Sequence, residues 1–149
     1  MFSSRISLLC WVWTAWAQAF IFLSILDDLG FDPYHGFFHQ PSYGHATLAS
    51  DLLEEFRAPL TDRLTLSLIN NRVLKEEDFY LHTASGSVYL TDEARKRYFQ
   101  EYEHFVTRPA GADQEGAPLA FRQLFRRQAE RLKETITTGA PYRPYAFSW

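Results

Sequence analysis

Residues 47–70 read TLASDLLEEFRAPLTDRLTLSLIN, and this stretch decides the fold class. Large apolar side chains recur at every fourth position: Leu48, Leu52, Phe56, Leu60, Leu64 and Leu68. This spacing predicts an apolar stripe along one side of a helix. Thr47 is expected to be the N-cap residue. Pro59 is expected to kink or restart the helix, and residues 70–72 to close it.

The same helix carries three acidic residues, Asp51, Glu54 and Glu55. Positions three and four apart share a helix face, so these carboxylates lie within about 100° of one another. A carboxylate pair offers the oxygen ligands that Mg²⁺ and Mn²⁺ prefer. A solvated acidic face near a helix N-terminus accounts for the same residues. The residue types alone leave both interpretations open.

A loop rich in glycine, proline and aromatic residues is predicted upstream, where residues 30–44 read GFDPYHGFFHQPSYG. His39 follows Phe37 and Phe38 in this loop. An imidazole can bind Mn²⁺ or Zn²⁺ and can act as a general acid or base. A lone loop histidine is also often structural or simply exposed, so His39 is a candidate only. His35 and His45 are weaker candidates of the same kind.

Downstream residues predict one hairpin and two more helices. The runs 79–81 and 88–90 flank Ser85-Gly86, which is typical of a β-hairpin. Thr91 is expected to cap a helix whose apolar side is Ala94, Tyr98, Tyr102 and Phe105. Residues 108–118 are expected to form a linker. A helix over about 119–137 should turn Leu124, Phe125, Ala129, Leu132 and Ile136 inward, with an extended tail from Gly139. The fold class is mostly α.

Residues 6–26 contain no formal charge, and Arg5 precedes them. The length suits a transmembrane helix or an uncleaved signal. Four polar residues interrupt the run, however: Ser7, Thr14, Gln18 and Ser24. The tryptophans gather at positions 11, 13 and 16 rather than at both ends. A buried helix is therefore favoured and a membrane role is not expected, although a small membrane-anchored protein stays an alternative.

Composition and charge narrow the class of protein. The single cysteine, Cys10, excludes an internal disulfide. The net charge of −3 is unevenly spread: residues 27–93 hold twelve acids and four bases, and residues 94–133 hold nine bases and five acids. In one interpretation, the carboxylates bind a cation and the nearby basic residues bind phosphates. In the other, both segments are ordinary solvated surfaces. The sequence lacks CxxC, HExxH, a glycine-rich phosphate loop and GxSxG, so zinc fingers, Walker ATPases and serine hydrolases have no support.

The run GFDPYHGFFH, residues 30–39, resembles a signature of the CRISPR adaptation integrase family, which typically reads Gly-Leu-Asp-Pro-Tyr-x-Gly-x-Leu-His. The family then shows a helix similar to residues 47–59, with Ala58 inserted here before the proline. Further blocks follow in the same order: residues 62–64, 68–70, 88–93 and 142–145. The resemblance covers about residues 24–147.

The resemblance implies a domain and a reaction. It implies a helical catalytic-domain fragment over residues 24–149, after an atypical apolar segment at 1–23. It also implies a metal-dependent DNA endonuclease and integrase of the prokaryotic cytoplasm that acts in spacer acquisition. In that reaction a spacer 3′-hydroxyl attacks a phosphodiester of the CRISPR repeat. The family's metal, Mg²⁺ or Mn²⁺, implies ligand roles for His39 and Glu54, with Asp51 as the companion carboxylate.

The resemblance also implies partners. They are double-stranded DNA of the spacer and the repeat, the small second-numbered CRISPR adaptation protein, and a second copy of the full-length protein. The residues expected to meet DNA phosphates are Arg57, Arg122, Arg126, Arg127 and Lys133. This set rests on charge and position and not on a family motif.

Two departures from the family pattern modify the expectation. The family's glutamate ligand and its N-terminal β-domain have no counterpart upstream of His39, and the tryptophan-rich stretch stands where a family helix is expected. A truncated or frame-disrupted gene product that rejoins the family near Ser24 would explain both. We expect weak or no catalysis by this chain alone. The alternative function is a non-catalytic module that binds DNA or a partner.

Overall fold

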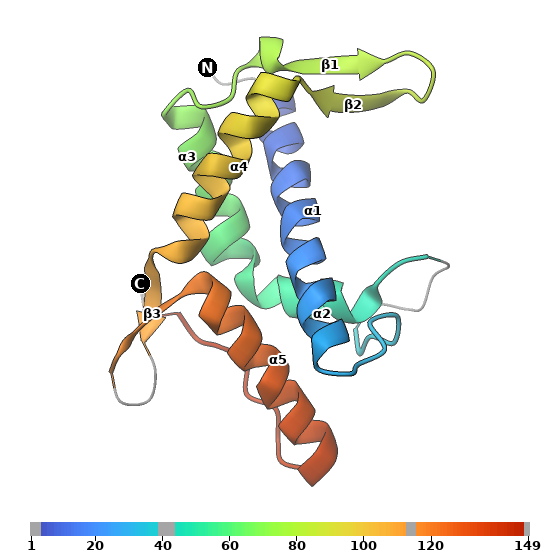
Figure 1. The fold of residues 1–149 in the computed structure, drawn as a ribbon, viewed down its shortest axis with the longest axis vertical. Coiled ribbons are helices and arrows are strands. Elements are labelled where there is room, and N and C mark those ends of the chain that lie inside the picture. The colour runs from blue at the N-terminus through green and yellow to red at the C-terminus, as the bar shows by residue number, and fades with distance from the viewer. Residues whose placement is uncertain (1–3, 39–43, 113–115, 148–149) are drawn as a thin grey trace.

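The computed structural model describes residues 4–38, 44–112 and 116–147. The described chain is mostly helical with two small antiparallel hairpins, which confirms the predicted fold class. Figure 1 shows α1 (Ser4–Asp28) running through the middle of the molecule. The hairpin of β1 (Phe79–His82) and β2 (Ser87–Leu90) projects at one end, and α5 (Phe121–Thr138) lies at the other.

The stripe predicted over residues 47–70 lies on three consecutive helical pieces. They are α2 (Thr47–Phe56), a π-helical segment η1 (Arg57–Asp62) and α3 (Arg63–Asn70). All six apolar residues of the stripe are buried. The break near Pro59 was predicted, because proline lacks the amide hydrogen that an α-helix needs. A four-residue repeat drifts by about 40° per step on an α-helix, and the wider turn absorbs part of that drift.

Helix α1 packs against this unit through one side. Its buried residues recur every four positions: Ile6, Cys10, Thr14, Gln18, Phe22 and Leu26. The Thr14 hydroxyl donates to the Cys10 carbonyl over 2.9 Å, and the Thr61 hydroxyl of η1 donates to Gln18 Oε1 over 2.9 Å. Two of the polar residues that interrupt the apolar run therefore face the protein. The domain boundary expected between residues 23 and 24 falls inside this continuous helix.

The first hairpin and the helix after it form as predicted. Strands β1 and β2 pair antiparallel with Phe79 opposite Leu90, and Gly86 in the turn has a φ of +67°. The Thr91 hydroxyl accepts the Ala94 amide over 3.3 Å and caps α4 (Asp92–Thr107). The predicted apolar side of α4 is buried, together with Val106.

Two expectations for the last third of the chain are wrong. Residues 108–118 are not a plain linker, because β3 (Pro109–Ala112) pairs antiparallel with β4 (Pro118–Ala120). Ile136 is 55% exposed and does not point inward, since the last turns of α5 extend beyond Leu132, the last buried residue of that helix. Residues 139–147 follow without helix or strand.

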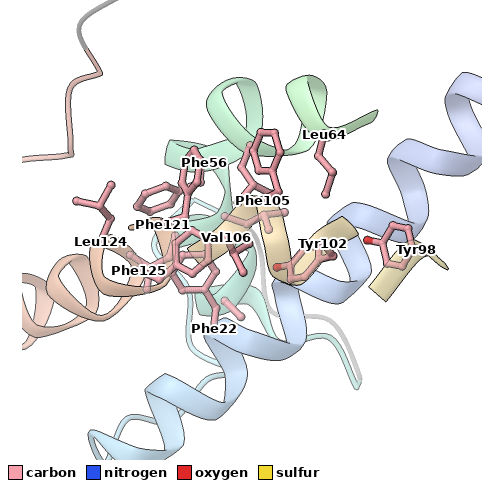
Figure 2. Close-up of a cluster of buried hydrophobic side chains, with 14 of the residues drawn as sticks. Phe22, Phe56, Leu64, Tyr98, Tyr102, Phe105, Val106, Phe121, Leu124 and Phe125 are labelled. Carbon is pink, nitrogen blue, oxygen red and sulfur yellow. The ribbon is translucent and has the colours of Figure 1, made fainter. Parts of the chain in front are cut away.

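Three helices meet at a cluster of phenylalanines, shown in Figure 2. Phe22 of α1, Phe56 of α2 and Phe125 of α5 are fully buried. Their ring centroids lie 4.8 Å apart for Phe56–Phe125, 4.9 Å for Phe22–Phe125 and 5.7 Å for Phe22–Phe56. Aromatic pairs at such distances add about 0.5–1.5 kcal/mol each beyond their burial. The cluster fixes α2 against α1, and so fixes both ends of the segment that joins them.

Residues Ile6–Asp28 of α1 are long and apolar enough to cross a membrane, judged by length and composition alone. Buried core helices and N-terminal signal sequences meet the same criteria. Here one side of α1 is buried in the core while Leu8, Trp16 and Phe20 on another side are exposed.

Candidate functional site

The segment after α1 is shaped by local hydrogen bonds. Gly30, with a φ of +78°, ends the helix in the left-handed conformation that glycine adopts without strain. Asp32 Oδ1 accepts the Tyr34 amide over 3.0 Å, and Asp32 Oδ2 lies 2.8 Å from His35 Nδ1. The Tyr34 amide bond, followed by the contact with His35, holds the pKa of Asp32 below its usual value. This turn directs the chain back toward the start of α2.

Thr47 ties the segment to α2 and does not act as the N-cap. Ala46 occupies the cap position and makes no side-chain cap bond. The Thr47 hydroxyl accepts the Gly36 amide over 2.8 Å and donates to the Tyr34 carbonyl over 2.7 Å. The predicted cap role of Thr47 is therefore wrong, because its hydroxyl is engaged by the preceding loop.

Asp51 receives the next two amides of the loop. The residue is 7% exposed, and its Oδ2 accepts the Phe37 amide over 2.5 Å and the Phe38 amide over 3.1 Å. A buried carboxylate needs such donors, since an unpaired buried charge is costly. The predicted candidate residue is thus part of a loop–helix contact.

Glu54 lies one turn further along α2 and has a different environment. Its side chain is 50% exposed, and Oε2 lies 3.2 Å from Arg57 Nη1. The Arg57 guanidinium also stacks over the Trp11 ring, 4.9 Å from its centroid. An exposed pair of this kind contributes little to stability, so the Glu54 carboxylate can exchange this partner for a bound cation.

Glu55 was predicted to share the acidic face but is tied to the C-terminal tail. Its carboxylate accepts bonds from Gln128 Nε2 at 2.7 Å, from the Tyr145 amide at 3.0 Å and from the Tyr142 hydroxyl. Burial and this carboxylate raise the pKa of Tyr142 above its usual value. Sequence reasoning missed this contact, although residues 142–145 had already been noted as a block of the family resemblance.

The third predicted metal ligand, His39, lies outside the described residues. Within the part of the chain that is described, no three His, Cys, Asp or Glu side chains converge to hold a metal ion. The described structure places Asp51 and Glu54 one turn apart on α2, with different partners, and the role of His39 stays a prediction. Carboxylate oxygens with one imidazole are a donor set that fits Mg²⁺ or Mn²⁺.

The residues predicted to meet DNA phosphates are all exposed: Arg57, Arg122, Arg126, Arg127 and Lys133. Three of them on α5 make contacts within the chain. Arg122 pairs with Glu103 at 2.6 Å, and Arg126 pairs with Asp28 at 2.8 Å. Lys133 Nζ donates to the Leu29 carbonyl over 2.7 Å. These residues lie along one helix, and Arg57 lies apart from them on η1.

The chain is similar to proteins of known family. A family model described as CRISPR associated protein Cas1 matches residues 21–104. The Cas4/endonuclease Cas1 fusion of Geobacter sulfurreducens is 34% identical over 119 residues, which are 80% of this chain and 21% of the relative. An endonuclease Cas1 of Thermus thermophilus is 36% identical over 118 residues, which are 78% of this chain and 35% of the relative. The chain thus spans between about a fifth and a third of these relatives.

Solved structures share the fold. A casposase bound to its integration product superposes with a TM-score of 0.78 at 17% identity, covering 93% of this chain and 41% of that one. A chain of a Cas6-RT-Cas1–Cas2 complex superposes with a TM-score of 0.71 at 25% identity, covering 87% of this chain and 14% of that one.

Proposed function

Because the chain belongs to the Cas1 family of CRISPR-associated proteins, we propose that it forms the metal-ligating helical part of a DNA endonuclease and integrase that acts in CRISPR adaptation. One observation carries the proposal. The family match at residues 21–104 spans the loop and α2, and on α2 the exposed Glu54 carboxylate lies one turn from Asp51. The proposed ligands are His39 and Glu54, with Asp51 as their companion, and the ion is Mg²⁺ or Mn²⁺.

A carboxylate oxygen from Glu54 and an imidazole nitrogen from His39 are donors that Mn²⁺ accepts, and the carboxylate oxygen also suits Mg²⁺. Once bound, a divalent ion polarises a phosphoryl oxygen and stabilises charge on the attacking or leaving oxygen. In the proposed transesterification a bond forms between a spacer 3′-oxygen and the phosphorus of a repeat phosphodiester. The bond from that phosphorus to the leaving 3′-oxygen breaks, and that oxygen takes up a proton as the attacking hydroxyl loses one. In the hydrolytic reaction, a water molecule attacks in place of the spacer hydroxyl.

The chain's basic residues are proposed to hold the DNA backbone. Arg122, Arg126, Arg127 and Lys133 lie on α5, and the acids that pair with Arg122 and Arg126 are exposed. Exposed ion pairs are weak, so phosphates can replace Glu103 and Asp28. Binding of this kind is independent of sequence and falls steeply with salt.

The proposed partners follow from the family and from the similar structures. They are double-stranded DNA of the spacer and the CRISPR repeat, the small protein Cas2, and a second Cas1 copy. The supporting observations are a similar structure that pairs Cas1 with Cas2 and another that holds an integration product. The proposed location is the prokaryotic cytoplasm.

Binding of Mn²⁺ to the purified chain tests the metal site. We expect titration calorimetry to detect binding that weakens at least about tenfold in His39→Ala and Glu54→Gln, since each change removes a ligand. Glu93→Gln, an exposed acid in the first turn of α4, serves as the control and should bind as the unmodified chain does. The proposal fails if the unmodified chain binds no Mn²⁺, or if all three variants bind equally well.

A DNA titration at rising salt, with and without Mn²⁺, separates this function from the non-catalytic alternative. A binding module would bind DNA without metal and never cleave it. We expect weak or no cleavage by the chain alone. Robust Mn²⁺-dependent cleavage that His39→Ala abolishes would contradict that expectation and support the enzyme.

A further inference from the structure

Three consecutive backbone amides before residue 39 donate to side chains of α2. The Gly36 amide donates to Thr47, and the Phe37 and Phe38 amides both donate to Asp51 Oδ2. The main chain of α2 adds a fourth bond, from the Leu48 amide to the Pro33 carbonyl over 3.0 Å. The loop is therefore held amide by amide against the first two turns of the helix.

The close approach depends on the absence of a side chain at position 36. A Cβ built on Gly36 would lie 2.6 Å from Asp51 Oδ2 and 2.8 Å from Thr47 Cβ. Atoms essentially never approach a Cβ so closely, so any other residue would push the loop away from α2. The glycine, the threonine and the aspartate form one interlocking contact, which we call the loop clamp (Gly36, Thr47 and Asp51).

Asp51 and Glu54, two acidic residues of α2, differ in burial and in the groups that they contact. Asp51 is buried and accepts two main-chain donors, whereas Glu54 is half exposed and, among the contacts described, pairs only with the half-exposed Arg57. Hydrogen bonds to an ionised acceptor are about twice as strong as neutral ones. Asp51 therefore restrains the loop more than a neutral residue of the same shape would.

We propose that Asp51 is a positioning residue: its carboxylate holds the main chain of residues 36–38 against α2 and so sets the direction in which the chain enters residue 39. The consequence for metal binding rests on the proposed function, in which His39 and Glu54 are ligands. Asp51 then acts through the loop, and Glu54 acts on the ion.

Amide hydrogen exchange in the metal-free chain tests the clamp without relying on the metal. We expect the Phe37 and Phe38 amides to be protected, and Asp51→Ala to speed their exchange by roughly 10- to 100-fold, because each loses a bond to a charged acceptor. Glu54→Ala is the matched control one turn away and should leave both rates unchanged. Unchanged exchange in Asp51→Ala would overturn the proposal.

Asp51→Asn keeps the test decisive if Asp51→Ala does not fold. The amide oxygen of asparagine still accepts, but as a neutral group, so we expect exchange at residues 37 and 38 to speed up by roughly three- to tenfold. Protection that is unchanged in Asp51→Asn as well would overturn the clamp.

Mn²⁺ affinity separates positioning from direct ligation. The asparagine oxygen still accepts the loop amides, so a positioning Asp51 predicts a smaller loss of Mn²⁺ affinity in Asp51→Asn than in Glu54→Gln. A loss in Asp51→Asn equal to that in Glu54→Gln would make Asp51 a ligand and overturn the proposal. If the unmodified chain binds no Mn²⁺, the proposed metal function fails, and the exchange rates still decide the clamp.

Discussion

The Glu55 carboxylate binds the C-terminal tail, so replacing Glu55 should lower the free energy of unfolding more than replacing its neighbour Glu54. Replacing Glu55 with alanine leaves the Tyr145 amide, the Tyr142 hydroxyl and Gln128 Nε2 without their shared acceptor. Bonds to charged groups contribute about 1.5–3 kcal/mol each, although losses at one group do not add. We expect Glu55→Ala to lower the free energy of unfolding by about 2–4 kcal/mol in urea titrations.

Glu54→Ala is the matched control for this prediction. Its carboxylate contacts only the exposed Arg57 among the described residues, so the change should stay within about 0.5 kcal/mol. Tyr142→Phe should fall between the two, because it removes one of the three donors to Glu55. Equal stability of Glu55→Ala and Glu54→Ala would mean that the tail does not depend on this carboxylate.

Cys10 should make the protein less stable at alkaline pH. Burial, and then the negative charge of Asp78, raise the pKa of this thiol from 9.0 to about 11. The unfolded chain loses the proton first, so the contribution to stability is complete below pH 9 and is lost as the pH rises through 11. This difference in the pKa of the thiol corresponds to a loss of free energy of unfolding on the order of 2–3 kcal/mol.

The difference between the unmodified chain and Cys10→Ala isolates this effect, since buried tyrosines titrate in both proteins. We expect urea titrations to show that the unmodified chain loses stability faster than Cys10→Ala between pH 9 and pH 11. The folded thiol should also resist a disulfide reagent at pH 8, because it is fully buried and protonated. Rapid labelling at pH 8 without unfolding would contradict the burial.

Helical periodicity predicted where the acids of α2 lie but not what they contact. The prediction that Asp51, Glu54 and Glu55 share one side of a helix describes angles only. Their different partners come from residues distant in sequence: Phe37 and Phe38 for Asp51, and Tyr142 and Tyr145 for Glu55. Such contacts depend on the packed fold, which periodicity cannot supply. The role of His39 stays a prediction.

At the scale of the elements, the threonine before α4 stabilises its helix in the way that sequence predicts. The Thr91 hydroxyl accepts the Ala94 amide, and its loss leaves a helix N-terminal amide without that partner. We expect Thr91→Ala to lower the free energy of unfolding by about 1 kcal/mol. Thr107→Ala, at the other end of α4, removes exposed bonds to the Glu103 and His104 carbonyls and is the control. Thermal unfolding of both variants measures the difference.

Elements with a regular apolar pattern were predictable, and those without one were not. The repeats in residues 47–70 and 94–105 follow the helix period, so α2, α3 and α4 were expected. Strands β3 and β4 contain Pro109, Gly111 and Pro118, which disfavour strands. They form because Leu119 is buried on α5 and the Tyr145 hydroxyl accepts the Ala112 amide over 3.3 Å. Distant packing therefore overrides local preference there.

At the scale of the whole molecule, α1 is apolar on both its buried and its exposed sides. The buried side contains Phe22 and Leu26, whereas Leu8, Trp16 and Phe20 are 62%, 61% and 63% exposed. The Trp16 and Phe20 rings lie 6.4 Å apart, and Leu8 and Val12 precede them at four-residue intervals on the same exposed side. A contiguous apolar surface on a soluble protein usually marks an interaction site or a tendency to aggregate.

We therefore expect the exposed side of α1 to limit solubility without supporting the fold. Replacing Leu8, Trp16 and Phe20 together with glutamine should leave the thermal unfolding midpoint nearly unchanged, because exposed positions contribute little to stability. Phe22→Ala on the buried side should instead lower the free energy of unfolding by about 3–5 kcal/mol. In sedimentation without detergent, the unmodified chain should associate with rising concentration, and the triple variant should stay near the monomer mass of 17.4 kDa. If both proteins are monomeric without detergent, the exposed side of α1 does not cause association in water. Flotation of only the unmodified chain with lipid vesicles would support the membrane alternative.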